Sequence, residues 1–369
     1  MNATALGGAS ATATGGGLDE RLVLAVDGGN SKTDLALARA SGRLVSFVRG
    51  PLSSPHHLGV DGSLEVLDGL LDEALSRAGL GSRGRPGIAF AEVLLAGLDF
   101  PAEEASLRDV IERRGWASRI EVGNDTFALL RAGTERGWGV AVVCGAGFNC
   151  VGVGPDGRHA RFAALGPTTG DWGGGYDIGL AALSAAARSQ DGRGPRTVLE
   201  HEVPAHFGLD TPLELAEALH LKKLPMQRLV ELSPMVLARA ADDPVCAALV
   251  DRLAAEVVAS TRAALTRLDL ADEPVDVVLG GGVLRSGNGQ LLAKIGAGLV
   301  GIGSKIDLRV CAAPPIVGAA LLALDNIGAG SEARERLRAE LSEAAEAAVG
   351  GDGRAPATPR GTAKRKSHG

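Results

Sequence analysis

The chain has 369 residues, which is enough for two domains of ordinary size. Its hydrophobic content of 45% and charged content of 22% are typical of a globular protein, and its net charge of -6 argues against a nucleic-acid partner, which needs a basic face. The four cysteines are scattered and form no CxxC pair, so the sequence indicates neither a zinc ribbon nor a disulfide framework.

The two ends of the chain differ in composition from the rest. The first 20 residues are small and polar and lack the basic start and apolar core of a secretory signal, so we expect a disordered tail at 1–20. Residues 350–369 are rich in Pro, Gly, Lys and Arg, which predicts a second, basic tail. No apolar run reaches the roughly 18 residues of a membrane span, so we expect a cytoplasmic protein without a membrane partner.

The first folded stretch is an apolar strand that ends in an acid and a glycine turn. Residues 22–26 form a continuous apolar run, typical of a buried strand. Asp27 and two glycines follow, then the polar trio 30–32, and an extended apolar pattern resumes at 33–37. Glycines let a ligand approach the backbone, and successive N–H groups in such a turn suit a phosphate. A hairpin without a ligand is the alternative at this point.

Strands and helices then alternate up to residue 135, with loops at 50–59 and 79–87. The predicted strands lie at 44–48, 92–96 and 120–122, and the predicted helices at 64–75, 101–114 and 126–135. The opening pattern returns at 140–143, where an apolar strand leads into a glycine turn at 145–147. Further strands follow at 149–153 and 161–165. An internal repeat of this size predicts two copies of one α/β unit with a ligand between them.

The second half of the chain is largely helical. Residues 166–179 are rich in glycine and predict a loop that opens a helix near Leu180. The stretch 195–268 predicts further helices, the longest of them at 244–268. The remaining predicted elements are strands at 275–279 and 306–310, helices at 290–299 and 315–326, and an amphipathic surface helix at 331–349.

Three glycine-rich turns each follow an apolar strand, at 27–32, 144–149 and 279–282. One such turn is weak evidence of a ligand site. Three of them in a repeated α/β frame indicate a nucleotide held between two halves, with N–H donors meeting different parts of it. No GxGxxG stretch joins a predicted strand to a following helix, as a Rossmann site requires, and GxxxxGK[ST] does not occur, so the sequence disfavours a Rossmann site and a P-loop.

Five motifs carry a resemblance that extends over about residues 22–326: DGGNSKTD (27–34), GNDT (123–126), GAGFNC (145–150), GDWGGGYDIG (170–179) and LGGGVLRS (279–286). Together they resemble the BadF/BadG/BcrA/BcrD ATPase family, and within it the N-acetylglucosamine kinases. The family belongs to the superfamily of sugar kinases, heat-shock ATPases and actin. The resemblance implies an α/β fold of two ribonuclease-H-like (actin-like ATPase) domains with a cleft between them. We expect these domains at 21–125 and 126–330, with the helix 315–326 packing back onto the first.

The resemblance also implies a role for each motif. Asp27 would face a Mg²⁺ ion through water, and Ser31 would meet the β- and γ-phosphates of ATP. Asp125 falls where these kinases keep the base that accepts the proton of the attacking sugar hydroxyl. Asp171 would accept hydrogen bonds from sugar hydroxyls. The other implied residues are Gly28, Gly29, Asn30, Lys32, Gly145, Ala146, Gly147, Gly280, Gly281 and Gly282 for the nucleotide, and Ser54, Asn124, Asn149 and Gly166 for the sugar.

Structural alternatives remain open for these acids. Asp27 could be an ordinary turn residue, Asp125 or Asn124 a helix cap, and Asp171 a polar loop residue before a helix. The sequence departs from the family on the sugar side, where Trp172 follows the acid of the GD pair. This indole would either stack on a sugar face or pack in the interdomain hinge.

The sequence therefore predicts a kinase that uses ATP and Mg²⁺ to phosphorylate a hydroxyl, the 6-OH, of N-acetylglucosamine or a related amino sugar or hexose. Its partner would be this small-molecule sugar, and a homodimer is one oligomeric state that the sequence allows. An activator ATPase of the same family is an alternative, although its cluster-binding cysteines have no counterpart here. A non-catalytic sugar sensor is a second alternative, against which the presence of both Asp27 and Asp125 argues.

Overall fold

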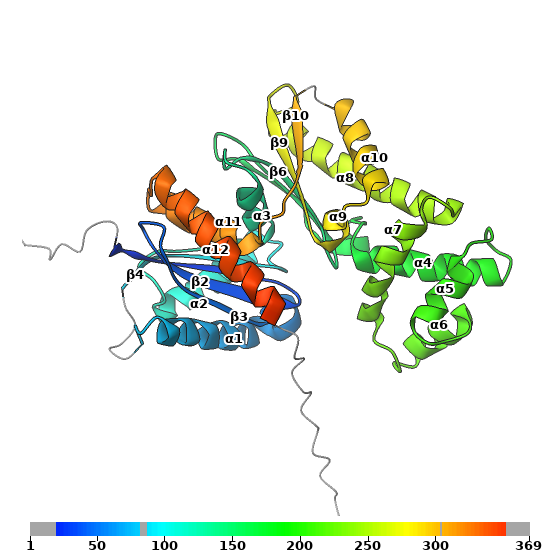
Figure 1. The fold of residues 1–369 in the computed structure, drawn as a ribbon, viewed down its shortest axis with the longest axis horizontal. Coiled ribbons are helices and arrows are strands. Elements are labelled where there is room, and N and C mark those ends of the chain that lie inside the picture. The colour runs from blue at the N-terminus through cyan, green and yellow to red at the C-terminus, as the bar shows by residue number, and fades with distance from the viewer. Residues whose placement is uncertain (1–19, 82–86, 303–304, 352–369) are drawn as a thin grey trace, which may run out of the picture.

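A computed structural model describes residues 20–81, 87–302 and 305–351, which form two five-stranded sheets with helices packed on them (Figure 1). The tails predicted at 1–20 and 350–369 lie almost entirely outside the described residues, as does most of the predicted connector at 79–87. Within the described ranges, no helix combines the length and the apolar character needed to cross a membrane.

The first sheet has the strand order β3-β2-β1-β4-β5. Its strands are β1 (Leu22–Gly28), β2 (Lys32–Arg39), β3 (Leu44–Pro51), β4 (Ile88–Leu95) and β5 (Ile120–Asn124). The first three strands form an antiparallel meander, whereas β4 runs parallel to both β1 and β5. Because β1, β4 and β5 are parallel, their carboxyl ends lie at one edge of the sheet, the usual place for a ligand in α/β proteins.

The second sheet repeats this topology. Its strands are β6 (Gly139–Cys144), β7 (Phe148–Val153), β8 (His159–Arg161), β9 (Val275–Gly280) and β10 (Ile306–Val310), in the order β10-β9-β6-β7-β8. Here too, three antiparallel strands come first, and two parallel strands follow: β9 pairs with β6, and β10 pairs with β9. The internal repeat predicted from the sequence is therefore confirmed.

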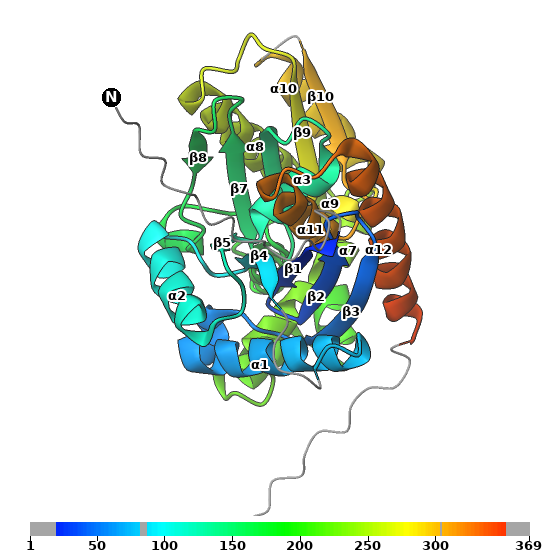
Figure 2. The same ribbon diagram turned by 90° about the vertical axis from the view of Figure 1, so that its left-hand side faces the viewer.

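Helices cover both faces of the first sheet (Figure 2). Leu22, Leu24 and Val26 of β1 point into a core with α1 (Pro55–Arg77) and α2 (Pro101–Arg114). The alternate residues Val23 and Ala25 point into a core with α11 (Pro315–Asn326) and α12 (Ser331–Gly351). This alternation is what a strand buried on both faces requires.

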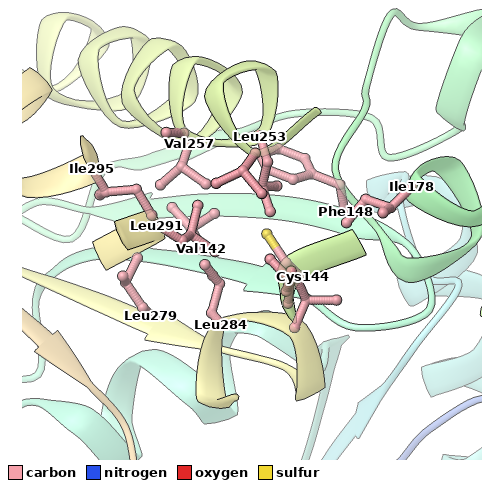
Figure 3. Packing of buried hydrophobic residues seen from close by; sticks show 14 of the residues in the cluster. Val142, Cys144, Phe148, Ile178, Leu253, Val257, Leu279, Leu284, Leu291 and Ile295 are labelled. Carbon is pink, nitrogen blue, oxygen red and sulfur yellow. The ribbon is translucent and has the colours of Figure 1, made fainter. Parts of the chain in front are cut away.

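The second sheet has its larger core on the face covered by α4 (Gly175–Gln190), α8 (Pro244–Arg267) and α10 (Gly289–Val300). Figure 3 shows Val142 and Cys144 of β6 packed there beneath Leu253 and Val257 of α8. The remaining helices of this half are α5 (Leu199–His206), α6 (Pro212–His220), α7 (Ser233–Arg239), α9 (Gly282–Arg285) and the 3-10 turns η2 (Gly166–Thr168) and η3 (Met226–Leu232).

Helix α3 (Thr126–Gly133) lies between the two sheets. Its residue Ala128 joins the core beneath α11. Leu129 and Leu130 join a smaller core on the face of the second sheet opposite α8. Helix α11 approaches α3 so closely that a Cβ on Gly318 would lie 1.8 Å from the carbonyl oxygen of Ala128. The small side chains of α11 thus bring the end of the chain back onto the first sheet.

Two stretches predicted as loops are partly helical. In 50–59, α1 begins at Pro55, whose fixed φ suits the first turn of a helix, and only Gly59 (φ 69°) interrupts it. In 166–179, α4 begins at Gly175 rather than near residue 180. Its Gly179 lets the η3 backbone approach, because a Cβ there would lie 1.9 Å from the carbonyl oxygen of Leu229. These glycines serve helix packing rather than a loop.

The third strand of the repeat is shorter than predicted. Strand β8 ends at Arg161, so the predicted strand at 161–165 is wrong beyond its first residue. Only Val151, Gly152 and Val153 of β7 pair with β8, and the chain then turns away toward η2.

The contact at Gly318 gives a first prediction. Gly318→Ala should lower the free energy of unfolding by roughly 1–3 kcal/mol, because the added methyl clashes with the α3 backbone. The matched control is Gly69→Ala in α1, where a Cβ meets no atom within 4 Å. The control should be neutral or stabilising by about 1 kcal/mol. Urea unfolding midpoints measure both, and equal effects of the two variants would contradict the packing described.

Candidate active site

Three carboxylates lie at or just beyond the carboxyl ends of three neighbouring parallel strands of the first sheet. Asp27 lies in β1, Asp99 follows β4, and Asp125 follows β5. Burial raises the pKa of Asp27 well above its usual range, and the charge of Asp125 raises it further. The sequence analysis identified Asp27 and Asp125 but missed Asp99, although Asp99 also comes shortly after a predicted strand. The structure thus groups three acids at the carboxyl edge of one sheet.

The Asp125 carboxylate does not cap the helix that follows it. The side-chain oxygen of Asn124 accepts the hydrogen bonds from the Thr126 N–H (3.0 Å) and hydroxyl (2.6 Å), and Asp125 makes no side-chain cap bond. Burial and then the charge of Asp99 raise the pKa of Asp125 to about 7, against a smaller opposing effect of nearby backbone N–H groups. A carboxylate with this pKa is suited to accept a proton near neutral pH.

The first glycine turn joins β1 to β2. The Gly29 N–H donates to the carbonyl of Lys32 (2.8 Å), and Asn30 and Ser31 are exposed. A Cβ on Gly28 would lie 2.3 Å from a Leu95 methyl and 2.4 Å from the Ser53 hydroxyl, so a larger residue at the start of the turn would have to displace buried side chains. The predicted phosphate-binding residues Asn30, Ser31 and Lys32 therefore stand at the surface, where a ligand can reach them.

A buried ion pair supports this turn from beneath. Asp34 accepts two hydrogen bonds from the Arg49 guanidinium, at 2.6 and 2.8 Å, and one from the Lys32 ammonium at 3.1 Å. The Asp34 side chain is fully buried, whereas that of Lys32 is 45% exposed. A bidentate pair of this kind fixes the geometry of its two side chains. Here it connects β2, just after the turn, to β3.

The second and third glycine turns touch one another. In the second, the Gly145 N–H donates to the carbonyl of Gly147 (2.9 Å), and Ala146 and Gly147 are exposed. In the third, Gly281 has φ +85°, and a Cβ there would lie 2.3 Å from the carbonyl oxygen of Cys144. Gly280 is buried at the end of β9, whereas Gly282 is exposed at the start of α9. The structure thus brings these two predicted nucleotide-binding turns together.

The predicted sugar loop lies against the second turn. Gly166 adopts φ +62° and its carbonyl accepts the N–H of Asp171 (3.0 Å), while the Asp171 carboxylate accepts the Thr169 hydroxyl (2.5 Å). A Cβ on Gly174 would lie 2.4 Å from the carbonyl oxygen of Ala146. Burial and the charge of Glu103 raise the pKa of Asp99, and the charge of Asp171 adds a smaller effect in the same direction.

Two polar contacts connect the sheets beside Asp125. The Asn149 side-chain amide donates to the side-chain oxygen of Asn124 (3.2 Å), so two predicted sugar-binding residues meet. Arg161 at the end of β8 donates to Glu104 of α2 (2.7 Å) and to the carbonyl of Leu98 (3.2 Å). No local motif marks Arg161. Its place beside α2 depends on how the three-residue strand β8 pairs with β7, which the sequence pattern does not show.

Ser54 differs from its predicted role. It is fully buried, and its hydroxyl donates to the carbonyl of Ala96 (2.9 Å). It precedes Pro55 at the first turn of α1, and the close approach of Gly97 encloses it. In this structure Ser54 therefore supports the site from within and does not present its hydroxyl to a sugar.

Trp172 packs against the core of the second sheet, and the guanidinium of Arg252 lies 4.1 Å from the centre of one of its rings. A cation over an indole face is a stabilising contact. Trp172 therefore packs within the second half, against α8, and not in the interdomain hinge that was one of the two alternatives.

The chemistry around Asp27 fits a Mg²⁺ ion held through water. In the described part of the chain, no three His, Cys, Asp or Glu side chains converge as direct metal ligands. Mg²⁺ keeps several waters and binds through one or two carboxylates together with substrate phosphates. Burial is the largest cause of the raised pKa of Asp27; the charges of Asp125 and Asp34 add to it, and those of Lys32 and Arg49 oppose it. A cation beside Asp27 would favour its ionised form against the effect of burial.

Comparison with known proteins decides the family. The model of the BadF/BadG/BcrA/BcrD ATPase family matches residues 24–323. The chain belongs to this family. The prediction made from the five motifs is confirmed, and the match extends across both sheets.

Curated relatives of this family member are named as kinases. The N-acetylmuramic acid/N-acetylglucosamine kinase of Clostridium acetobutylicum is 28% identical over 270 residues, which cover 73% of this chain and 87% of the relative. The N-acetyl-D-glucosamine kinase of Dictyostelium discoideum is 25% identical over 230 residues, 60% of this chain and 72% of the relative. These names support the predicted class of sugar kinase.

A solved structure confirms the predicted fold class. A Chromobacterium violaceum protein, provisionally described as an N-acetylglucosamine kinase, superimposes with a TM-score of 0.64. The match covers 83% of this chain and 99% of that one at 24% identity. At this identity the likeness shows the fold, an α/β arrangement of two actin-like ATPase domains.

The raised pKa of Asp125 predicts a pH-dependent gain in stability on its replacement. The folded chain keeps the Asp125 proton up to about pH 7, whereas the unfolded chain loses it near pH 4. The cost of ionising this group in the folded chain therefore grows as the pH rises from about 4 to 7. Asp125→Asn removes this cost and should raise stability at pH 8 by about 0.5–2 kcal/mol.

The gain should be smaller at pH 5 than at pH 8. Thermal unfolding at the two pH values measures it, with Asp61→Asn on the exposed face of α1 as the matched control. A gain from Asp125→Asn that is equal at both pH values would show that the carboxyl ionises normally in the folded chain.

Proposed function

We propose that this chain is an ATP-dependent kinase that phosphorylates a hydroxyl, the 6-OH, of N-acetylglucosamine or a related amino sugar or hexose. The observation that carries the proposal is the placement of Asp125. Its carboxylate makes no cap hydrogen bond and has a pKa of about 7. It lies at the same edge of the sheet as the first glycine turn, which follows β1. The kinase names of the two curated relatives support the same activity.

In the proposed reaction, the glycine turns hold ATP. The turns at 28–32 and 145–147, in which residues 30–32 and 146–147 are exposed, would meet the phosphates, and the turn at 280–282 would meet the adenosine. Phosphoryl transfer depends on positioning and on neutralising charge, which backbone donors and Lys32 supply. Asp27 would hold Mg²⁺ through water, and the bound ion would add positive charge near the phosphates.

Asp125 would act on the acceptor. The sugar oxygen forms a bond to the γ-phosphorus, the bond from that phosphorus to the β–γ bridging oxygen breaks, and ADP leaves with the electron pair. The hydroxyl proton passes to the Asp125 carboxylate, a step that typically contributes about 10²–10⁴ in rate. Asp171 and Asn149 would hold the sugar's other hydroxyls, because both are partly exposed beside the second turn.

Observations on the cysteines speak against the activator alternative. Cys144, Cys150, Cys246 and Cys311 are all buried. Burial raises the pKa of Cys150 and of Cys246 to about 12. Several cysteine thiolates must converge to hold an iron–sulfur cluster, and the described residues contain no such group.

A coupled assay for ADP formation over a panel of sugars tests the proposal. The panel holds N-acetylglucosamine, glucosamine, glucose and N-acetylmuramic acid, each with and without Mg²⁺. We expect sugar-dependent turnover that requires Mg²⁺, with the new phosphate on the 6-hydroxyl by NMR. ATP hydrolysis that no sugar stimulates would refute the kinase assignment.

Replacing the base gives a sharper prediction. Asp125→Asn should lower kcat by about 10² or more while sugar binding persists, because the amide cannot accept the hydroxyl proton. Initial rates and calorimetric binding of the sugar measure the two effects. Asp61→Asn, a change of the same size on an exposed helix, should leave both unchanged. Turnover close to that of the parent chain would remove Asp125 from the mechanism.

A further inference from the structure

Arg161 connects the second half of the molecule to the first. Its guanidinium donates to the Glu104 carboxylate of α2 (2.7 Å) and to the carbonyl of Leu98, just after β4 (3.2 Å). The side chain of Arg161 is 22% exposed and that of Glu104 is 14% exposed. Water and salt therefore screen this ion pair much less than they screen an exposed one.

Each end of this contact is fixed in its own half. Arg161 ends β8, where it pairs with Val151 of β7, and its carbonyl accepts a hydrogen bond from Arg267 of α8 (2.9 Å). On the other side, Leu98 is buried in the core of the first sheet, and so is Leu107 of α2. A change in the arrangement of the two halves would therefore act directly on the hydrogen bonds that Arg161 makes.

The contact lies beside the helix that joins the two halves. The Arg161 guanidinium lies 5.6 Å from the ring centre of Phe127, the second residue of α3. A cavity of only about 10 Å³ remains here, and Phe127, Asn149 and Phe162 help to line it. Such a volume holds about one water molecule, so the halves are closely packed at this point. Domains turn about short segments at the ends of elements, and α3 begins at this contact.

The Leu98 carbonyl links the contact to the proposed base. The same oxygen accepts a hydrogen bond from the side-chain amide of Asn124 (3.1 Å), and Asn124 directly precedes Asp125. The side-chain oxygen of Asn124 in turn accepts the amide of Asn149 from the second half (3.2 Å). The contact between the halves thus reaches the residue next to the Asp125 carboxylate.

We propose that Arg161 is a positioning residue, and that its contact with Glu104 and the Leu98 carbonyl is a fixed pivot about which the two halves close. This inference rests on the proposed kinase function. The pivot keeps Asn149 of the second half aligned with Asp125 of the first, so that the sugar hydroxyl meets the carboxylate when the cleft closes. Arg161 acts through these contacts and not on the reacting atoms.

The charge of Glu104 makes the role of Arg161 testable. Oε1 of Glu104 is buried without a hydrogen-bond partner among the described residues, whereas Oε2 accepts the bond from Arg161. Removing one partner of a shielded ion pair leaves an uncompensated charge, which is more costly than removing both charges. Arg161→Met should therefore be more damaging alone than when it is combined with Glu104→Gln.

Initial rates and calorimetric sugar binding test the pivot. Arg161→Met should lower kcat about 10-fold or more and change the Kd for the sugar less than about threefold, because misalignment costs rate more than affinity. Arg161→Lys should lie between, since an ammonium lacks the planar fork that reaches two acceptors. Adding Glu104→Gln to Arg161→Met should recover part of kcat. The control Arg158→Met breaks ion pairs with Asp156 and Asp269 inside the second half and should keep the parent rate.

A distance measurement tests the pivot without turnover. The four cysteines of the chain are buried, so spin labels attach to Asp109→Cys in α2 and Ala259→Cys in α8, both at exposed positions. Pulsed electron resonance then reports the distance between the halves in the ligand-free chain. We expect one narrow distribution of distances in the parent chain and in Arg158→Met, and a broader one in Arg161→Met.

Two results would overturn the proposal. One is a distribution of distances in Arg161→Met that is no broader than that of the parent chain. The other is a double variant in which the kcat losses of Arg161→Met and Glu104→Gln multiply, because the two side chains would then act independently. The distance measurement also separates this inference from the kinase assignment. If no sugar is phosphorylated, the proposed function fails, whereas a distribution broadened by Arg161→Met and not by Arg158→Met would still support the pivot.

Discussion

The close contact between helices α11 and α3 at Gly318 is the constraint on which the arrangement of the two sheets depends. Helix α3 has one face in the core beneath α11 and its other face in a core of the second sheet. Asp125 directly precedes α3, so the position of this carboxylate follows from packing on both sides. Interiors are close-packed and deform little, which makes this helix a firm base for the site.

The site itself works against stability. Asp27, Asp99 and Asp125 share one edge of the first sheet, and burial raises the pKa of each. The charge of Asp125 adds to the shift of Asp27, and the charge of Asp99 adds to that of Asp125. Like charges gathered in this way are typical of functional sites, because folding alone would not favour them. The contacts of Asn124 with Asn149 and of Arg161 with Glu104 hold the facing halves together across this edge.

Local patterns predicted the strands, the three turns and two of the three acids, because hydrophobic runs and glycine pairs report on the backbone nearby. The glycines at 175 and 179 favour a loop in the sequence. In the structure they lie in α4 and let it approach η3, about 50 residues further along the chain. For the same reason the sequence could not show that Ser54 is buried, nor that Arg161 faces Glu104. Such facts depend on tertiary packing.

The account's central claim is that the two halves clasp ATP and a sugar with Asp125 at the acceptor hydroxyl. A crystal structure with a non-hydrolysable ATP analogue, Mg²⁺ and N-acetylglucosamine tests it most directly. We predict phosphates on the turns at 28–32 and 145–147, and the 6-hydroxyl within about 2.6–3.2 Å of the Asp125 carboxylate. A sugar or nucleotide bound elsewhere, with Asp125 out of reach of any hydroxyl, would contradict the account.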